Sequence, residues 1–217
     1  NGSFIMDTEN LKEVIVRDAQ RKLGKLLKEF KRGAITGDRR RQGNWVGNKQ
    51  VQARMDNFVR ELFGVDTGDA SAKAMAEAWT KVSDELKDRF NKAGGAIGTL
   101  EKWGLPQSHN REALLNVGQR KWVEYMMGDG VLDREKTVHP LTRKPLSNDD
   151  LRTALEVSWR RIVTDGAIDM EVKPQGGAGG KAALYKQHSD HRFLHFANAD
   201  AWLAYQKSYG APDVFGT

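Results

Sequence analysis

The sequence predicts a mainly α-helical fold: an irregular multi-helix bundle with long loops and at most a minor β-hairpin near residues 168–196. Apolar residues recur at spacings of three and four along most of the 217 residues, which is the helical period. Cysteine is absent, which excludes a disulfide scaffold, a cysteine zinc site and a thiol nucleophile. No apolar run approaches the roughly 20 residues that span a bilayer, so no transmembrane segment is predicted.

The first predicted helix covers residues 8–31, where one apolar stripe runs between lysines and arginines. Three glycines between residues 33 and 43 interrupt that pattern and predict a loop, which contains Arg39, Arg40 and Arg41. A second helix is expected to carry the apolar residues from Val51 to Leu62.

A third helix follows over residues 72–90. Either Asp69 or Ser71 is expected to cap its N-terminus, and a glycine pair lies beyond its end. In the second half, Asn110 is expected to cap a helix that continues toward Met126, and Gly118 is expected to split it.

The stretch from Gly128 to Pro145 predicts a long connection, because its two prolines interrupt any regular helix. Ser147 and Asp150 resemble a capping box, which opens a helix that ends at Gly166. Residues 174–180 are glycine-rich and predict a flexible loop. Asn198 is then expected to cap a short final helix.

Strand signals are scarce, and the best candidates for a hairpin are Ile168–Val172 and Arg192–Phe196. The predicted organisation is a basic helical region over residues 1–64 and a helical module over residues 65–217. Five residues precede Met6 and no capped end closes the chain, so we expect a fragment of a longer protein.

Positive charge is concentrated near one end of the chain. The net charge is +6, but residues 17–54 hold twelve Lys/Arg against three Asp/Glu, a net of +9. Such concentration is typical of a phosphate-binding surface, although a solvated helix face gives the same pattern. The candidate nucleic-acid-binding residues are Lys25, Lys28, Lys31, Arg32, Arg39, Arg40, Arg41, Trp45 and Lys49.

Trp45 is the one tryptophan outside the helical apolar stripes, and it follows the arginine run between two glycines. An exposed aromatic ring beside arginines can stack on a base. The same ring can instead pin the loop to the core.

Catalytic patterns are weak, and no cofactor is predicted. His188, Asp190, His191 and His195 form the one cluster with metal-ligand chemistry, but no Glu lies between the last two histidines as in a metalloprotease helix. Gly180 and Lys181 lack the spacing of a phosphate-binding P-loop. His109 and His139 show no partner in the sequence, so no catalytic residue is assigned and enzymatic activity is not predicted.

Four runs of the chain share a further pattern: Arg89–Gly95, Trp103–His109, His191–Phe196 and Asn198–Tyr205. Together they resemble a module of very large tailed-bacteriophage proteins of the internal virion or ejection type, and the similarity covers roughly residues 57–217. The resemblance implies a place in the virion, or in the host cytoplasm or periplasm after infection. It also implies other virion proteins or copies of the same chain as partners, and it supplies no catalytic residues.

Three functions remain open from the sequence. The first is a structural and interaction module that contacts double- or single-stranded DNA through the basic region. The second is a dedicated nucleic-acid-binding domain of a phage polymerase, helicase or packaging factor, whose binding is lost when Arg39, Arg40 and Arg41 become glutamate. The third is a metal-dependent hydrolase that uses the histidine cluster.

Overall fold

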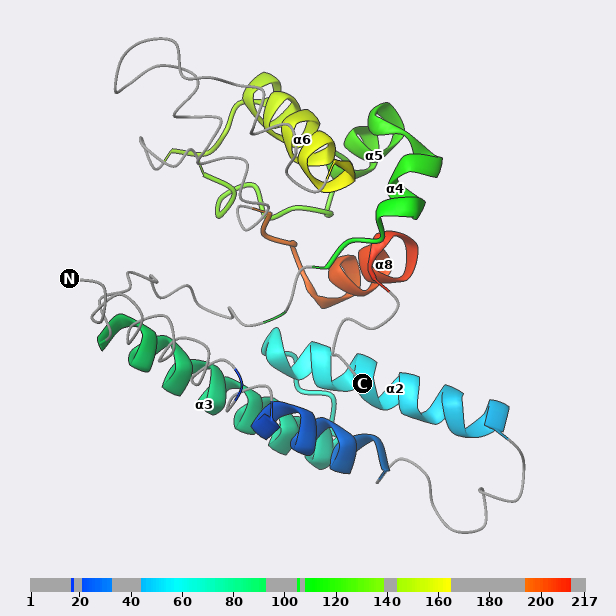
Figure 1. The fold of residues 1–217 in the computed structure, drawn as a ribbon, viewed down its shortest axis with the longest axis vertical. Helices are drawn as coiled ribbons and strands as arrows, with labels where there is room; N and C mark the ends of the chain where they lie inside the picture. The colour runs from blue at the N-terminus through cyan, green and yellow to red at the C-terminus, as the bar shows by residue number, and fades with distance from the viewer. Residues whose placement is uncertain are drawn as a thin grey trace, which may run out of the picture. The chain divides into compact units, whose positions relative to one another are not determined.

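A computed structural model describes residues 17, 21–32, 44–92, 105, 108–138, 144–164 and 194–211. These residues are mainly helical and almost free of strand, which confirms the predicted fold class. The helices drawn in Figure 1 fall into two compact units, with the boundary after Pro106. None of the described helices is long and apolar enough to cross a membrane.

The first unit contains a helical segment over residues 21–32, α2 (Asn44–Leu62) and α3 (Ala70–Lys92). Each helix contributes one apolar face, as the three-and-four spacing predicts. The rings of Phe30, Phe58 and Trp79 connect the three helices, with centroids 5.9 Å and 5.7 Å apart along that chain of contacts. The buried apolar residues of this unit are Leu27, Phe30, Met55, Phe58, Val59, Ala72, Met75, Ala76 and Trp79.

The turn between α2 and α3 is fixed by its own side chains. The carboxylate of Asp69 accepts the backbone N–H groups of Ser71 and Ala72, each at 3.0 Å. Of the two expected caps, Asp69 is therefore the one that satisfies the free donors at the start of α3. Gly64 and Gly68 have φ values of 79° and 71°, in the left-handed region that favours glycine.

The second unit begins with two short helices, α4 (Arg111–Val117) and α5 (Gln119–Met126). The side chain of Asn110 accepts the N–H of Ala113 at 3.1 Å, so it caps α4 as predicted. Gly118 separates the helices with a φ of 79°, a conformation that a residue with a Cβ rarely adopts. The predicted split at Gly118 is confirmed.

The connection that follows α5 is irregular in its described residues, and it leads to α6 (Asn148–Val163). Ser147 Oγ accepts the N–H of Asp150 at 3.1 Å and donates to the carboxylate of that residue at 2.6 Å. This reciprocal pair is the predicted capping box. Thr164 lies at the end of α6, two residues before the expected stop.

The last described stretch leads into α8 (Ala199–Tyr209), which Asn198 caps by accepting the N–H of Ala201 at 2.9 Å. Phe196 pairs with Leu132 through an isolated antiparallel bridge. The core of this unit consists of Leu114, Trp122, Val123, Met126, Leu132, Leu146, Leu151, Ala154, Leu155, Val163, Leu194, Phe196, Ala199, Trp202 and Tyr205.

One helix begins earlier than the sequence predicts. α2 begins at Asn44, so the backbone of Trp45 is helical rather than part of the expected loop. A single glycine such as Gly47 inside a helix has only a modest cost. α3 packs against α2, so the first unit contains residues on both sides of position 64. The described partner of Phe196 is Leu132, and the hairpin stays a prediction because residues 168–193 lie outside the described ranges.

Candidate nucleic-acid interface

One face of the helical segment 21–32 carries a row of four cations, Arg21, Lys25, Lys28 and Arg32, which we call the basic row. Their spacings of four, three and four residues return to the same side of a helix that turns about 100° per residue, so the row fills an arc of roughly 60°. At about 1.5 Å per residue the row extends about 16.5 Å along the helix axis. All four side chains are exposed.

The opposite face of this segment anchors it to the unit. Leu27 and Phe30 retain only 1% and 7% of their exposure, and on the helix they lie on the far side from the basic row. The guanidinium carbon of Arg54 in α2 lies 4.6 Å from the centroid of the Phe30 ring, which is a cation–π contact. The helix that carries the basic row is therefore packed against the rest of the unit through its opposite face.

Three of the four charges in the basic row have no ion-pair partner among the described carboxylates: those of Lys25, Lys28 and Arg32. Arg21 has a further interaction within the chain. Lys22 lies about 60° around the helix from Lys25, the nearest member of the row, and pairs with Glu85 of α3 at 4.0 Å. This ion pair lies beside the row, and its half-exposed partners contribute little to stability.

The exposed side of α3, in the same unit, is an ordinary solvated helix face. Lys73, Glu77, Lys81 and Glu85 follow one another at four-residue spacing with alternating charge, and all four are exposed. Such alternation supports a helix through neighbouring ion pairs and creates no net field. The four positions of the basic row carry a single sign, although Glu29 of the same segment is an exposed carboxylate about 40° around the helix from Lys25.

The other predicted nucleic-acid-binding residues are placed less completely. Lys31 is half-buried beside the basic row, and Lys49 is exposed on α2. Arg39, Arg40 and Arg41 lie outside the described ranges, as does the side chain of Trp45. The structure thus brings Lys25, Lys28 and Arg32 together and adds Arg21, which is not among the binding residues predicted from the sequence. The helical spacing of residues 21, 25, 28 and 32 is the sequence signal that identifies Arg21 as a member of the row.

Of the four metal candidates, only His195 lies in the described part of the chain, and His188, Asp190 and His191 lie outside it. Burial lowers the pKa of the His195 imidazole, the Asp133 carboxylate raises it, and Lys136 lowers it again. The backbone carbonyl of His195 accepts the N–H of Asp133 at 2.7 Å. Across the described ranges, no three His, Cys, Asp or Glu side chains gather closely enough to bind a metal ion.

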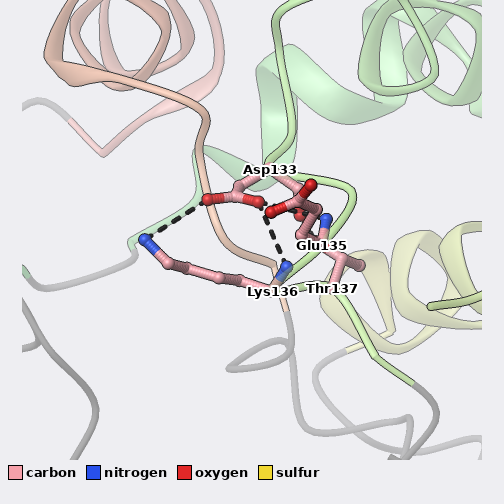
Figure 2. Close-up of polar contacts among 4 residues, drawn as sticks. All are labelled: Asp133, Glu135, Lys136 and Thr137. Carbon is pink, nitrogen blue, oxygen red and sulfur yellow. Dashed lines mark hydrogen bonds and ion pairs between the residues drawn. The ribbon is translucent and has the colours of Figure 1, made fainter. Parts of the chain in front are cut away.

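Figure 2 shows how the Asp133 carboxylate organises the turn over residues 133–137. One oxygen accepts the backbone N–H groups of Glu135 and Lys136, each at 3.1 Å, and the other lies 3.3 Å from the Lys136 ammonium. Partial burial raises the pKa of this carboxyl, but these hydrogen bonds and the Lys136 charge outweigh burial and hold it below its ordinary value near 3.8. The arrangement is a turn cap that leaves little of the carboxylate free for chemistry.

The second unit also contains a buried polar group that the sequence did not reveal. Tyr205 is fully buried, its hydroxyl lies 2.7 Å from Nδ1 of His109, and the indole N–H of Trp122 donates to the same oxygen at 3.3 Å. His109, which showed no partner in the sequence, therefore joins α8 to the segment before α4. We interpret the group as structural, because it pairs buried polar atoms and burial raises the pKa of the Tyr205 hydroxyl above its ordinary value near 10.

Comparison of the chain with protein-family models, curated proteins and solved structures finds no match. The basic row is the feature of the described residues with the clearest chemical consequence.

Proposed function

We propose that this chain is a helical structural module that binds DNA without sequence preference through the basic row. The observation that carries the proposal is the row itself: four exposed cations on one face, opposite a buried apolar face. In keeping with the resemblance of residues 57–217, we propose a place among bacteriophage internal virion or ejection proteins. The partners would then be packaged or translocating DNA, other virion proteins and further copies of the chain.

The physical basis is neutralisation of phosphate charge. Each lysine or arginine that meets a phosphate releases condensed counterions, and this release favours binding at low salt. Contacts to phosphates fix position without reading bases, which suits a protein that must hold DNA of any sequence. The two lysines of the row act as point charges, and its two arginines add the option of a bidentate contact.

The test is fluorescence anisotropy of a labelled mixed-sequence DNA duplex, titrated with the full chain at about 50 and 200 mM salt. Four phosphate contacts give a slope of about −3.6 in log K against log salt, so affinity should fall at least about 150-fold between these conditions. Two duplexes of unrelated sequence should bind alike. Absence of binding at the lower salt would overturn the proposal.

A matched pair of variants distinguishes an effect of the basic row on DNA binding from an effect of the overall charge. Lys25→Ala/Lys28→Ala/Arg32→Ala should reduce the salt slope by about 2.7, because three contacts are lost. Lys73→Ala/Lys81→Ala/Lys92→Ala removes the same charge from the exposed side of α3 and should leave the slope within about 0.5 of the wild type. Equal effects in the two variants would contradict a localised site.

Anionic vesicles provide a further arm of the test. A basic helix face is also able to attract an anionic lipid surface. Sedimentation with vesicles of phosphatidylserine and phosphatidylcholine should show weaker binding than the duplex does at the same salt. Vesicle binding without duplex binding would replace DNA by a lipid surface and overturn the proposal.

A further inference from the structure

We infer that the basic row binds double-stranded rather than single-stranded DNA, with its two ends on opposite strands across the major groove. This inference rests on the proposed function and adds the ligand's strandedness and the way it is held. It follows from the length of the row, its rigidity and the kind of side chain that it lacks.

The length of the row matches a duplex groove. Arg21 and Arg32 are separated by about 16.5 Å along the helix axis, and the major groove of B-DNA is about 12 Å wide. A helix laid across the groove therefore reaches the phosphates on both of its walls with these two long side chains. Lys25 and Lys28 then face the groove between them, where the two backbones add their negative potentials.

The rigidity of the row also favours a duplex. Phe30 is buried against Phe58, and Arg54 covers the Phe30 ring, so the helix that carries the row cannot turn to follow a flexible strand. Two strands of a duplex hold their phosphates at a fixed separation, which a fixed row of cations can match without either partner reorganising. A single strand must first be ordered to meet the same four charges.

Single-strand binding without sequence preference usually combines a basic groove with aromatic side chains on which bases stack. None of the aromatic side chains described in the first unit lies on the face of the basic row. Phe30, Phe58 and Trp79 are buried, and Phe63 is half-buried after the end of α2. The described face therefore offers phosphate contacts alone, which are sufficient for a duplex.

The experiment compares the labelled duplex with a labelled 20-nucleotide thymidine strand, using the full chain at about 50 mM salt. The duplex should bind at least about tenfold tighter, with a salt slope near −3.6 against about −2.8 for four contacts to a single strand. Equal or tighter binding of the thymidine strand would overturn this inference and leave the proposed function standing. If neither the duplex nor the thymidine strand bound, both this inference and the proposed function would be overturned.

Two double variants with the same charge loss test the groove-spanning arrangement. Arg21→Ala/Arg32→Ala removes the ends of the row and should abolish the preference for the duplex, because the remaining lysines are too close together to bridge both strands. Lys25→Ala/Lys28→Ala should lower the affinity for both ligands and leave most of the preference for the duplex. The same ratio of affinities in both variants would overturn the bridging arrangement, and far-UV circular dichroism would establish that each variant is folded.

Discussion

The hydroxyl of Tyr205 lies 2.7 Å from Nδ1 of His109, although 96 residues separate them in the chain. The indole N–H of Trp122 donates to the same hydroxyl oxygen at 3.3 Å, so the phenolic proton is available to His109. This one oxygen therefore links α8, α5 and the residue before the cap of α4.

We expect Tyr205→Phe to reduce the free energy of unfolding of the second unit by about 1–3 kcal/mol. The ring stays, but the Trp122 N–H loses its described acceptor in a buried position, and leaving a buried donor unsatisfied has a cost of this size. Urea unfolding followed by tryptophan fluorescence would measure the loss.

The control is Tyr209→Phe, in the same helix. The Tyr209 ring lies 5.4 Å from that of Tyr205, but no described group hydrogen-bonds to its hydroxyl and the side chain is half-buried. Tyr209→Phe should lower the free energy of unfolding by less than about 0.5 kcal/mol. Equal losses in the two variants would show that the buried hydroxyl has no special role.

A second prediction concerns the start of α6. Ser147→Ala should cost about 1 kcal/mol, because the hydroxyl accepts the Asp150 N–H and donates to the Asp150 carboxylate. Thermal unfolding should show a lower midpoint for the second unit. Ser208→Ala, an exposed serine inside α8, should change stability by less than about 0.5 kcal/mol, and a comparable loss there would argue against the cap.

A third prediction concerns acid. The pKa of the Asp133 carboxyl is lowered in the folded chain, so its contribution is present above the unfolded value near 3.8 and is lost as pH falls through the folded value. Asp133→Asn should therefore lower the free energy of unfolding by about 1 kcal/mol near pH 7. It should have no effect at pH values below the folded pKa, where the wild-type carboxyl is protonated. Urea unfolding at a series of pH values would show the two curves converge as pH falls.

Asp129→Asn is the matched control for that series, since Asp129 is an exposed carboxylate a few residues earlier with no described partner. It should change stability by less than about 0.5 kcal/mol at pH 7. A difference between Asp133→Asn and the wild type that grows as pH falls would have the wrong sign and would reject the turn cap as the cause.

Local features of this fold could be predicted from the sequence because they depend on neighbours in the chain. Asn110, Ser147 and Asn198 each satisfy an N–H group three residues ahead, and Gly118 separates two helices through its own φ value. The period of apolar residues likewise predicted the buried faces.

Features that depend on distant parts of the chain could not be predicted in this way. The partner of His109 lies in α8, and nothing near either residue indicates the pairing. The start of α2 was predicted too late because Gly43 and Gly47 indicate a loop, whereas the helix begins at Asn44. The charge window was visible in the sequence, but its division into an exposed row and a separate Lys22–Glu85 pair required the packing of the segment against α3.

The final prediction tests whether the arrangement of the basic row, rather than total charge, binds DNA. Phe30→Ala should cost about 3–5 kcal/mol in the first unit, because it removes a ring that contacts both Phe58 and Arg54. A helix as short as this segment is marginal in water without its packed face. The row should then lose its fixed spacing, although no cation has been removed.

Duplex affinity should therefore fall by at least about tenfold in Phe30→Ala, a change of roughly 1.4 kcal/mol in binding free energy. Phe30→Leu keeps an apolar anchor at the same position, so its affinity should lie within about threefold of the wild type. Circular dichroism would report the helix and anisotropy the binding. Wild-type affinity in a Phe30→Ala chain with reduced helix content would mean that charge density alone attracts the duplex, because disordered cations would then serve as well as the ordered row.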